Sequence, residues 1–437
     1  MTRKRLIDAA WLMLLAVYIL AGVPLASFHG DEAMQIYMSH DYARAFIYGD
    51  VNALKTRPPY EIDTDPHLRI LNGSVNRYAI GLSWHLAGFT NGDLPPRPGW
   101  DWGLSVDTNI ETGHRPPDAL LHVARLSSAL FLSLSVPILF GLASLFGGRP
   151  AAYVATALYA LHPVVLLNGR RAMQEGSMLF FGLAVVLVAA IISRRRAAGE
   201  RVPLPLWALL PLTGGLALVS KHSAVVFVAG AFGWLVLAEL THFRPRPLLQ
   251  LIGALALAGA LTAGLFLLLS PALWDDPPAR FADLLAVRAQ LLDIQVAVSP
   301  TGATTLAQRV EGIVTQPFLT PPQHYEVAYW TESAAAVTEI DRYMASPLSG
   351  VQFGVILGLP LTLLAALGIP LAFARSRALG AGLLAWLIVI VLSLLANPLP
   401  WQRYYLPLYP AAALLAAISA AALIRWIGQR RRVVRNL

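Results

Sequence analysis

The feature that most constrains this chain is a series of apolar segments, each long enough to cross a lipid bilayer as a helix. A spanning α-helix needs about 20 predominantly apolar residues, because the hydrocarbon core of a bilayer is about 30 Å thick. Only 13% of the 437 residues are charged, and 56% are hydrophobic. Since soluble domains carry about 25% charged residues, the composition predicts an integral membrane protein.

Ten such segments predict an all-α membrane protein with about ten transmembrane helices. They lie at residues 6–26, 119–146, 150–168, 172–193, 204–220, 222–241, 248–270, 348–373, 378–396 and 404–425. Only a short break near Ser220 separates the fifth segment from the sixth. The first segment follows a basic start, as a signal peptide would, but it has the length of a spanning helix, so we expect it to be an uncleaved span.

The basic residues alternate from turn to turn, which predicts the orientation, because cytoplasmic loops of membrane proteins are rich in Lys and Arg. If the N-terminus is cytoplasmic, the inner turns hold most of the Lys and Arg residues, including the runs at 194–196 and 430–432. The short outer turns hold only Arg170, Arg171, Lys221 and Arg403. Both termini are therefore expected in the cytoplasm, and the Arg-rich, Lys-poor composition suggests a bacterial inner membrane.

Two long segments, residues 27–118 and 271–347, remain outside the spans, and both fall on the extracytoplasmic side of this topology. We interpret residues 1–437 as a single polytopic domain with these two external loops. Apolar residues recur at helical spacing in "DEAMQIYMSHDYARAFIYG" and in "FADLLAVRAQLLDIQVAV". This pattern predicts amphipathic helices that lie along the membrane surface, with Gln35, Asp41 and Arg44 off the apolar face of the first.

Composition also excludes several kinds of chemistry. The chain has no cysteine, so disulfides, thiolate metal sites and thiol catalysis are absent. The net charge of +8 does not indicate a nucleic-acid-binding protein, because the basic residues lie at the ends of the apolar segments.

Ionisable and aromatic residues gather at the outer ends of the predicted spans. Charges in or near a bilayer are costly and usually mark a functional site. The candidates are Asp31, Glu32, Arg77, Tyr78, Arg125, Arg170, Arg171, Glu175, Lys221, His222, Arg403 and Tyr404. Such a set suits chemistry on an anionic, lipid-borne substrate, since Arg offers paired donors that match a phosphate and Lys adds a point charge.

Each candidate also has a purely structural explanation. Asp31 suits a helix cap, and Lys221 can extend its ammonium group to the interface. Arg170 and Arg171 suit lipid phosphates, His222 suits an ordinary polar contact, and Tyr404 fits the interfacial aromatic belt. The functional interpretation depends on the set as a whole.

The ordered motifs resemble those of GT-C glycosyltransferases of the family 39 kind, related to protein O-mannosyltransferases and lipid A aminoarabinose transferases. The resemblance lies in "DE" after the first span, "ARLSSALF", "YALHPVVLLNGRRAMQEGSMLFF", "SKHSA" and "RYYLPLYP". Many relatives carry a basic residue before a Pro-Pro pair in the first external loop, and here Arg77 and Arg115 are the alternatives. The second acid is Glu32 where relatives have Asp.

The resemblance implies a membrane enzyme that moves a sugar from a polyprenyl-phosphate donor to an acceptor hydroxyl, with inversion at the anomeric carbon. Asp31 would be the general base, with Glu32 and Glu175 shaping the sugar or acceptor site. Arg125, Lys221 and Arg403, with Arg170 and Arg171 behind them, would bind the donor phosphate. Arg77, Tyr78, His222 and Tyr404 would contact substrate. The partners would be the lipid donor, membrane lipids and a protein, lipid or glycan acceptor.

No cofactor is assigned from the sequence. A divalent cation stays open, because His29, Asp31, Glu32 and Glu175 carry suitable ligand atoms, but no ligand spacing decides for a metal. The alternatives to a transferase are a lipid-glycan transporter or flippase, a glycan ligase and a non-catalytic scaffold. A transporter would place its charges at mid-depth in pseudo-symmetric broken helices, whereas here they gather at one face.

Overall fold

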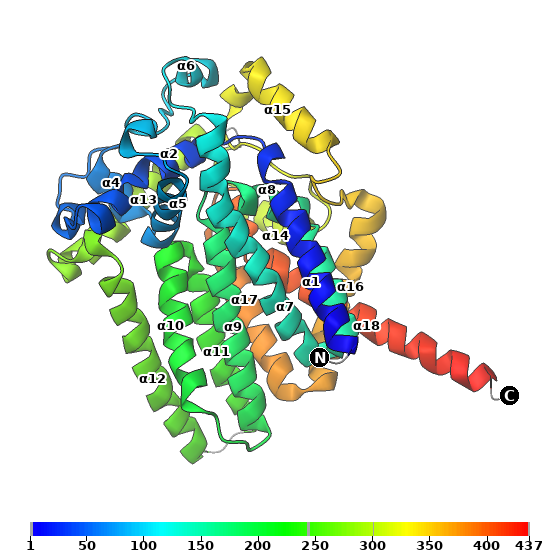
Figure 1. Ribbon diagram of the computed structural model, residues 1–437. Helices are drawn as coiled ribbons and strands as arrows, with labels where there is room; N and C mark the ends of the chain where they lie inside the picture. Colours follow the sequence, from blue (N-terminus) through cyan, green and yellow to red (C-terminus); the bar gives the residue numbers. More distant parts are fainter. Residues whose placement is uncertain (1–2, 243–244, 300, 436–437) are drawn as a thin grey trace.

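The computed structural model describes residues 3–242, 245–299 and 301–435. Within these ranges all regular structure is helical and no strand forms, which confirms the predicted all-α fold class. The helices form one bundle that is capped at one end by shorter helices (Figure 1). The N-terminus lies away from the capped end, and the C-terminal part of the last helix projects from the bundle.

Eight helices are long and apolar enough to cross a membrane, so the chain is an integral membrane protein. They are α1 (Arg3–Ala21), α7 (Asp118–Ala160), α9 (Glu175–Ala197), α11 (Val225–Leu240) together with the short helix η5 (His222–Ala224) before it, α12 (Pro245–Leu268), α16 (Gly354–Arg375), α17 (Arg377–Ala396) and α18 (Leu408–Arg435). Helix α10 (Leu204–Ser220) is also apolar but has 17 residues.

The predicted spans at 119–146 and 150–168 correspond to a kinked α7 followed by the short helix α8 (Pro163–Arg170). Gly148 interrupts α7 with a φ of 67°, a left-handed conformation that glycine adopts without steric cost. Pro150 follows at the start of the second half, where its missing N–H costs nothing. A second break at Leu161 and His162 separates α7 from α8.

Helices α11 and α17 pack through two reciprocal glycine–tryptophan contacts. A Cβ atom on Gly382 of α17 would lie 2.1 Å from Trp234 Nε1 of α11, and one on Gly230 of α11 would lie 2.4 Å from Trp386 Cδ1 of α17. In both helices the glycine and the tryptophan are four residues apart and therefore share one face. Each indole fills the space that the opposite glycine leaves, which lets the two helices approach closely.

The two long segments between spans fold into shorter helices at the capped end of the bundle (Figure 1). The first contains α2 (Gly30–Met38), α3 (His40–Tyr42), α4 (Asp65–Leu71), α5 (Ser74–Leu86) and α6 (Val106–Glu111). The second contains α13 (Pro277–Val298), α14 (Leu306–Thr315) and α15 (Ala334–Ala345). The side of the membrane on which this end lies stays a prediction from the basic residues.

Helix α2 and the residues after it are more enclosed than expected for a helix on a membrane surface. Gln35 and Asp41, which were expected off the apolar face, are both buried. The Gln35 amide donates to Asn72 at 3.0 Å, and Asp41 pairs with Arg69 at 2.7 Å. Polar partners from α4 and the residue after it therefore cover this segment, and they position the start of α2 above the bundle.

Candidate active site

Asp31 and Glu32 are adjacent in the chain, but their side chains have different surroundings. The N-cap of α2 is His29, whose imidazole accepts a hydrogen bond from the Asp31 N–H at 3.1 Å. Glu32 completes a capping box by accepting from the His29 N–H at 3.1 Å. Asp31 is therefore not the cap. Its side chain stays 24% exposed, whereas that of Glu32 is fully buried.

Two other parts of the chain hold the Glu32 side chain. Its carboxylate accepts two hydrogen bonds from the Arg125 guanidinium, at 2.7 and 2.8 Å, and one from the Ala172 N–H at 2.9 Å. Burial raises the pKa of the Glu32 carboxyl, but the charge and hydrogen bonds of Arg125 outweigh burial and leave this pKa below its ordinary value. Glu32 is therefore an ionised anchor that ties α2 to α7 and to the turn before α9.

Asp31 faces Arg403, which lies in the short helix η8 (Gln402–Tyr405) before the last span. The Arg403 guanidinium donates to the Asp31 carboxylate, and the His29 ring lies 3.8 Å from the same oxygen. Loss of solvation raises the pKa of Asp31, but the positive charge of Arg403 more than compensates and the pKa is lowered. Asp31 is thus an ionised carboxylate that remains partly accessible.

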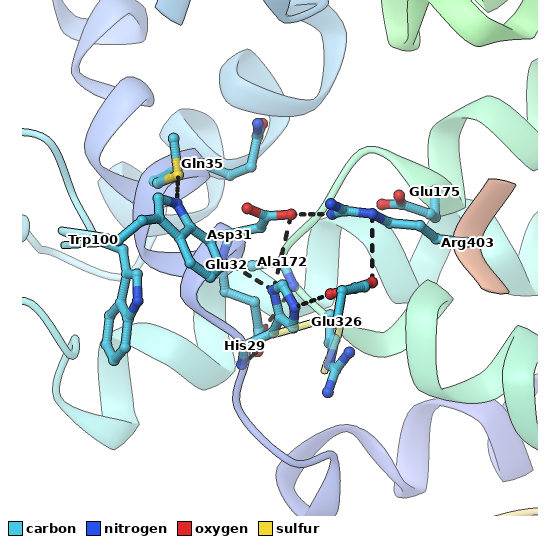
Figure 2. A network of polar contacts seen from close by, with 12 residues as sticks. His29, Asp31, Glu32, Gln35, Trp100, Ala172, Glu175, Glu326 and Arg403 are labelled. Carbon is cyan, nitrogen blue, oxygen red and sulfur yellow. Dashed lines mark hydrogen bonds and ion pairs between the residues drawn. The ribbon is translucent and has the colours of Figure 1, made fainter. Parts of the chain in front are cut away.

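Glu326 joins Asp31's two neighbours into one network (Figure 2). Its carboxylate lies 2.8 Å from His29 Nε2 and 3.4 Å from Arg403 Nε. Burial raises the pKa of Glu326, and the nearby Arg403 and His29 lower it well below its usual range. The His29 ring also stacks on the Trp330 ring, with a centroid distance of 5.8 Å, and this contact helps to hold the imidazole in place.

Glu175, the first residue of α9, forms an ion pair with Lys221 at 2.5 Å. Glu175 is buried, and 15% of the Lys221 side chain is exposed. Burial alone would lower the pKa of Arg403, but Glu326, Asp31 and, more weakly, Glu175 raise it. Figure 2 shows Glu175 beside the Arg403 side chain. The structure thus brings Asp31, Glu175, Lys221 and Arg403 to one region.

Arg170 and Arg171 are engaged by backbone carbonyls. Arg170 donates to the carbonyls of Ile19 and Tyr18 at 2.8 and 2.7 Å, at the end of α1. Arg171 donates to the Ser27 and His324 carbonyls at 3.0 and 2.8 Å. Both side chains are almost fully buried, so they connect segments of this protein and do not present free donors to a lipid phosphate.

Arg77 and Tyr78 lie on α5, in the charged network of the first long segment. Arg77 is buried, and its nearest acid is Asp41 at 3.2 Å. Its Nε and Nη1 atoms have no hydrogen-bond partner among the described residues. The Tyr78 ring meets Phe46 edge-on at 5.3 Å. No hydrogen bond or ion pair within the described ranges links this pair to Asp31 or Arg403.

Tyr404 follows Arg403 and faces α13. Its hydroxyl donates to Gln295 at 3.2 Å, and its ring stacks on Trp401 at 5.9 Å. Burial raises the pKa of Tyr404, while the charges of Arg403 and Arg288 oppose that rise. Arg288, about two turns before Gln295 on α13, therefore lies close enough to Tyr404 for its charge to act there. No hydrogen bond or ion pair engages Arg288 in the part of the chain that the structure describes.

The helix arrangement resembles those of two solved membrane proteins. One is ArnT from Cupriavidus metallidurans bound to undecaprenyl phosphate, with a TM-score of 0.55, 15% identity, and coverage of 96% of this chain and 60% of ArnT. The other is the archaeal oligosaccharyltransferase AglB from Archaeoglobus fulgidus in complex with an inhibitory peptide and a dolichol-phosphate. Its TM-score is 0.54, with 13% identity and coverage of 100% of this chain and 52% of AglB.

Residues 110–272 match the family model of dolichyl-phosphate-mannose-protein mannosyltransferases. This chain has a GT-C fold. The resemblance that the ordered motifs predicted is thereby confirmed. No curated protein matches the chain by sequence. The chain spans 60% of the ArnT chain and 52% of the AglB chain, which is little more than half the length of each.

In this GT-C fold a pocket opens between α9, α11 and α17, next to the Arg403 network. Its apolar wall includes Met178, Val226, Ile390 and Leu394. Its polar end is formed by Arg403 and Tyr404, together with Ser223, Ser393 and Asn397. The pocket therefore places apolar side chains of three helices next to Arg403.

The carboxylates and imidazoles that were considered as metal ligands are dispersed. His29 and Asp31 are neighbours, but Glu32 faces Arg125 and Glu175 faces Lys221. Within the described residues no group of three or more His, Cys, Asp or Glu side chains is arranged to hold a metal ion.

Sequence reasoning did not single out Glu326 or Arg288. Glu326 is a lone acid in the loop segment "HYEVAYW", and nothing in that stretch indicates that it will fold back onto Arg403. Arg288 left a weak signal, because it interrupts the apolar stretch "DLLAVRAQLL" directly after the buried Val287.

Proposed function

We propose that this chain transfers a sugar from a polyprenyl-phosphate donor to an acceptor hydroxyl on the extracytoplasmic side, with inversion at the anomeric carbon. The observation that carries the proposal is the network of Asp31, Arg403 and Glu326 at the polar end of an apolar pocket. It puts a partly exposed carboxylate beside cations, and one of these cations lies next to apolar side chains that a lipid chain could contact, which is the combination that this chemistry needs.

Asp31 is the proposed general base. The acceptor hydroxyl must lose its proton as it attacks the anomeric carbon, and a nearby carboxylate can take that proton. The lowered pKa of Asp31 makes it a weak base that is always ready, so its catalytic value lies mainly in its position. Glu32 is fully buried and held by Arg125. We therefore assign Glu32 to positioning α2, and not to direct contact with the substrate.

Arg403, Lys221 and Arg288 are the proposed ligands of the donor phosphate. The departing lipid phosphate gains negative charge, and fixed cations stabilise it. Arg403 lines the pocket, and Arg288 has no acid partner among the described residues. Tyr404 lines the pocket and His222 precedes its lining residue Ser223, so we assign both to contact with the donor. Arg125, Arg170 and Arg171 are engaged by protein groups, so we assign them to holding the site together.

The two solved complexes support a lipid-phosphate donor. ArnT was solved with undecaprenyl phosphate, and AglB was solved with a dolichol-phosphate and an inhibitory peptide. Glu175 is held at 2.5 Å by Lys221, and we propose that this pair borders the sugar. In a single displacement the acceptor attacks as the phosphate leaves. No covalent sugar–enzyme intermediate forms, so the anomeric configuration inverts.

The test is a transfer assay with the full chain in detergent, using polyprenyl-phosphate donors that carry radiolabelled mannose or aminoarabinose. We expect release of the lipid phosphate together with a glycosylated acceptor of inverted anomeric configuration, as read by NMR of the product. Movement of the intact lipid-linked sugar across proteoliposome membranes without bond cleavage would instead establish a flippase and would contradict the proposal.

A further inference from the structure

A second pocket, which shares no lining residue with the pocket beside Arg403, lies where the first two spans reach the capped end of the bundle. Its floor comes from Pro24, Leu25 and Ala26, which follow α1. Its charged wall comes from two elements: Arg115, Asp118, His122 and Arg125 lie in or just before α7, and Glu339 and Arg342 lie on α15. We call this the α1–α7 pocket.

One face of α7 supplies much of this wall. The lining residues from α7 are Asp118 and the residues three, four and seven positions after it, namely Leu121, His122 and Arg125. At this spacing they share one face over the first two helical turns. A helix that starts inside a bilayer would present apolar residues here. Two ionisable side chains and a histidine on one face indicate instead that this face meets a polar group.

The pocket has more hydrogen-bond donors than acceptors. Arg115 holds Glu339 at 2.6 Å, but its Nε has no partner among the described residues. Arg342 forms no ion pair or hydrogen bond within the described ranges, whereas Arg125 is already engaged by Glu32 and by the Val23 carbonyl. Two acids lie nearby. Asp118 is 71% exposed, and Glu339 is already occupied by Arg115 and the Phe28 N–H.

We propose that the α1–α7 pocket binds a phosphate group. Arg342, which has no partner among the described residues, and Arg115, whose Nε is unpartnered, offer the planar, charged donors that suit a phosphate. The candidate spans that frame the pocket end at Leu25 and begin at Asp118, which is the depth of lipid headgroups. The phosphate is therefore carried by an anionic lipid headgroup or is free in solution. The site is distinct from the donor-phosphate site and does not depend on the proposed transfer reaction.

Binding to the purified full-length protein tests this proposal. Short-chain phosphatidylglycerol, phosphatidylcholine of the same chain length and inorganic phosphate are each titrated in detergent, with affinity read by native mass spectrometry or thermophoresis. Arg342→Glu and Arg115→Gln are the pocket variants. Arg194→Glu, an exposed arginine at the far end of α9, is the control for altered net charge.

We expect both pocket variants to weaken binding at least tenfold and Arg194→Glu to leave it unchanged. Tighter binding of phosphatidylglycerol than of phosphatidylcholine and phosphate identifies a lipid headgroup, and equal binding of phosphatidylglycerol and phosphate identifies the phosphate alone. Either result supports the site. If Arg342→Glu binds phosphatidylglycerol and inorganic phosphate as tightly as Arg194→Glu does, the proposal is overturned. Arg342 is exposed and unpaired among the described residues, so its variant is expected to fold even if Arg115→Gln does not.

Discussion

Arg403 donates a hydrogen bond to the carboxylate of Asp31 across 372 positions of the chain. The contact joins the first turn of α2 to the segment that precedes the last span. The site is therefore built from residues near both ends of the sequence. The charge state of Asp31 depends on Arg403, although no local sequence motif connects the two residues.

Replacing Arg403 is expected to move the acidic limb of the pH–activity profile upward. The positive charge lowers the pKa of Asp31, so the wild-type base stays ionised below the ordinary carboxyl value of 3.8. In Arg403→Gln the raising effect of burial is no longer opposed by that charge, so the pKa of Asp31 should rise. Arg403→Lys keeps the charge and should keep the limb near its wild-type position. Profiles of kcat/KM against pH measure this, and identical limbs in the Gln and Lys variants would refute the coupling.

Glu32→Gln is expected to destabilise the protein by about 3–5 kcal/mol, because it leaves the buried Arg125 without its partner. Asp118→Asn, which removes an acid that is 71% exposed, should cost far less. Unfolding in detergent measures both. The pKa of Glu32 is lowered on folding, so its contribution is present above its ordinary value of 4.5 and fades as pH falls through the folded value. Equal stability of the two variants would argue against an anchor.

Arg288→Gln is expected to raise the KM for the lipid donor about tenfold or more, with little change in thermal stability. A charged hydrogen bond to a phosphate is worth about 1.5–3 kcal/mol, and Arg288 forms no ion pair among the described residues whose loss would unfold the protein. Arg280→Gln on the same helix is the matched control, because Arg280 pairs with Asp283 at 3.1 Å. An unchanged KM in Arg288→Gln would remove this residue from the donor site.

Gly382→Ala is expected to destabilise the bundle by about 1–3 kcal/mol, because the new methyl group would meet the Trp234 indole in a filled interface. Gly253→Ala on α12 is the control, since nothing lies within 4 Å of the position that its methyl group would occupy. Alanine also favours a helix over glycine, so the control should be neutral or slightly stabilising. Thermal unfolding of the two variants compares them directly, and a stable Gly382→Ala would contradict the close α11–α17 contact.

The fold was largely predictable because spanning helices have a strong local signal in length and apolar composition. The gap between the predicted spans 119–146 and 150–168 coincides with the kink at Gly148, but the same signal did not reveal the second break at Leu161 and His162, which separates α8 from α7. The site was predictable only in part. Asp31, Glu175, Lys221 and Arg403 do gather, as charges at span ends suggested.

The remaining candidates show where sequence reasoning fails. Arg125 and Arg171 resemble phosphate ligands in the sequence, but their partners are Glu32 and the carbonyl of Ser27. A sequence gives the charge of a residue and not which distant group will neutralise it. For the same reason Glu326 could not be assigned, because its contacts with His29 and Arg403 form only when the second long segment folds back.

The most direct test of the central claim is sugar transfer by Asp31→Asn, measured beside Asp31→Glu and the wild type with the same labelled lipid donor. The amide keeps the size of the side chain and removes its basicity. We predict that Asp31→Asn lowers kcat about 100-fold or more while donor binding persists, and that Asp31→Glu retains part of the activity. Full transfer by a folded Asp31→Asn protein would contradict the assignment of Asp31 as the base.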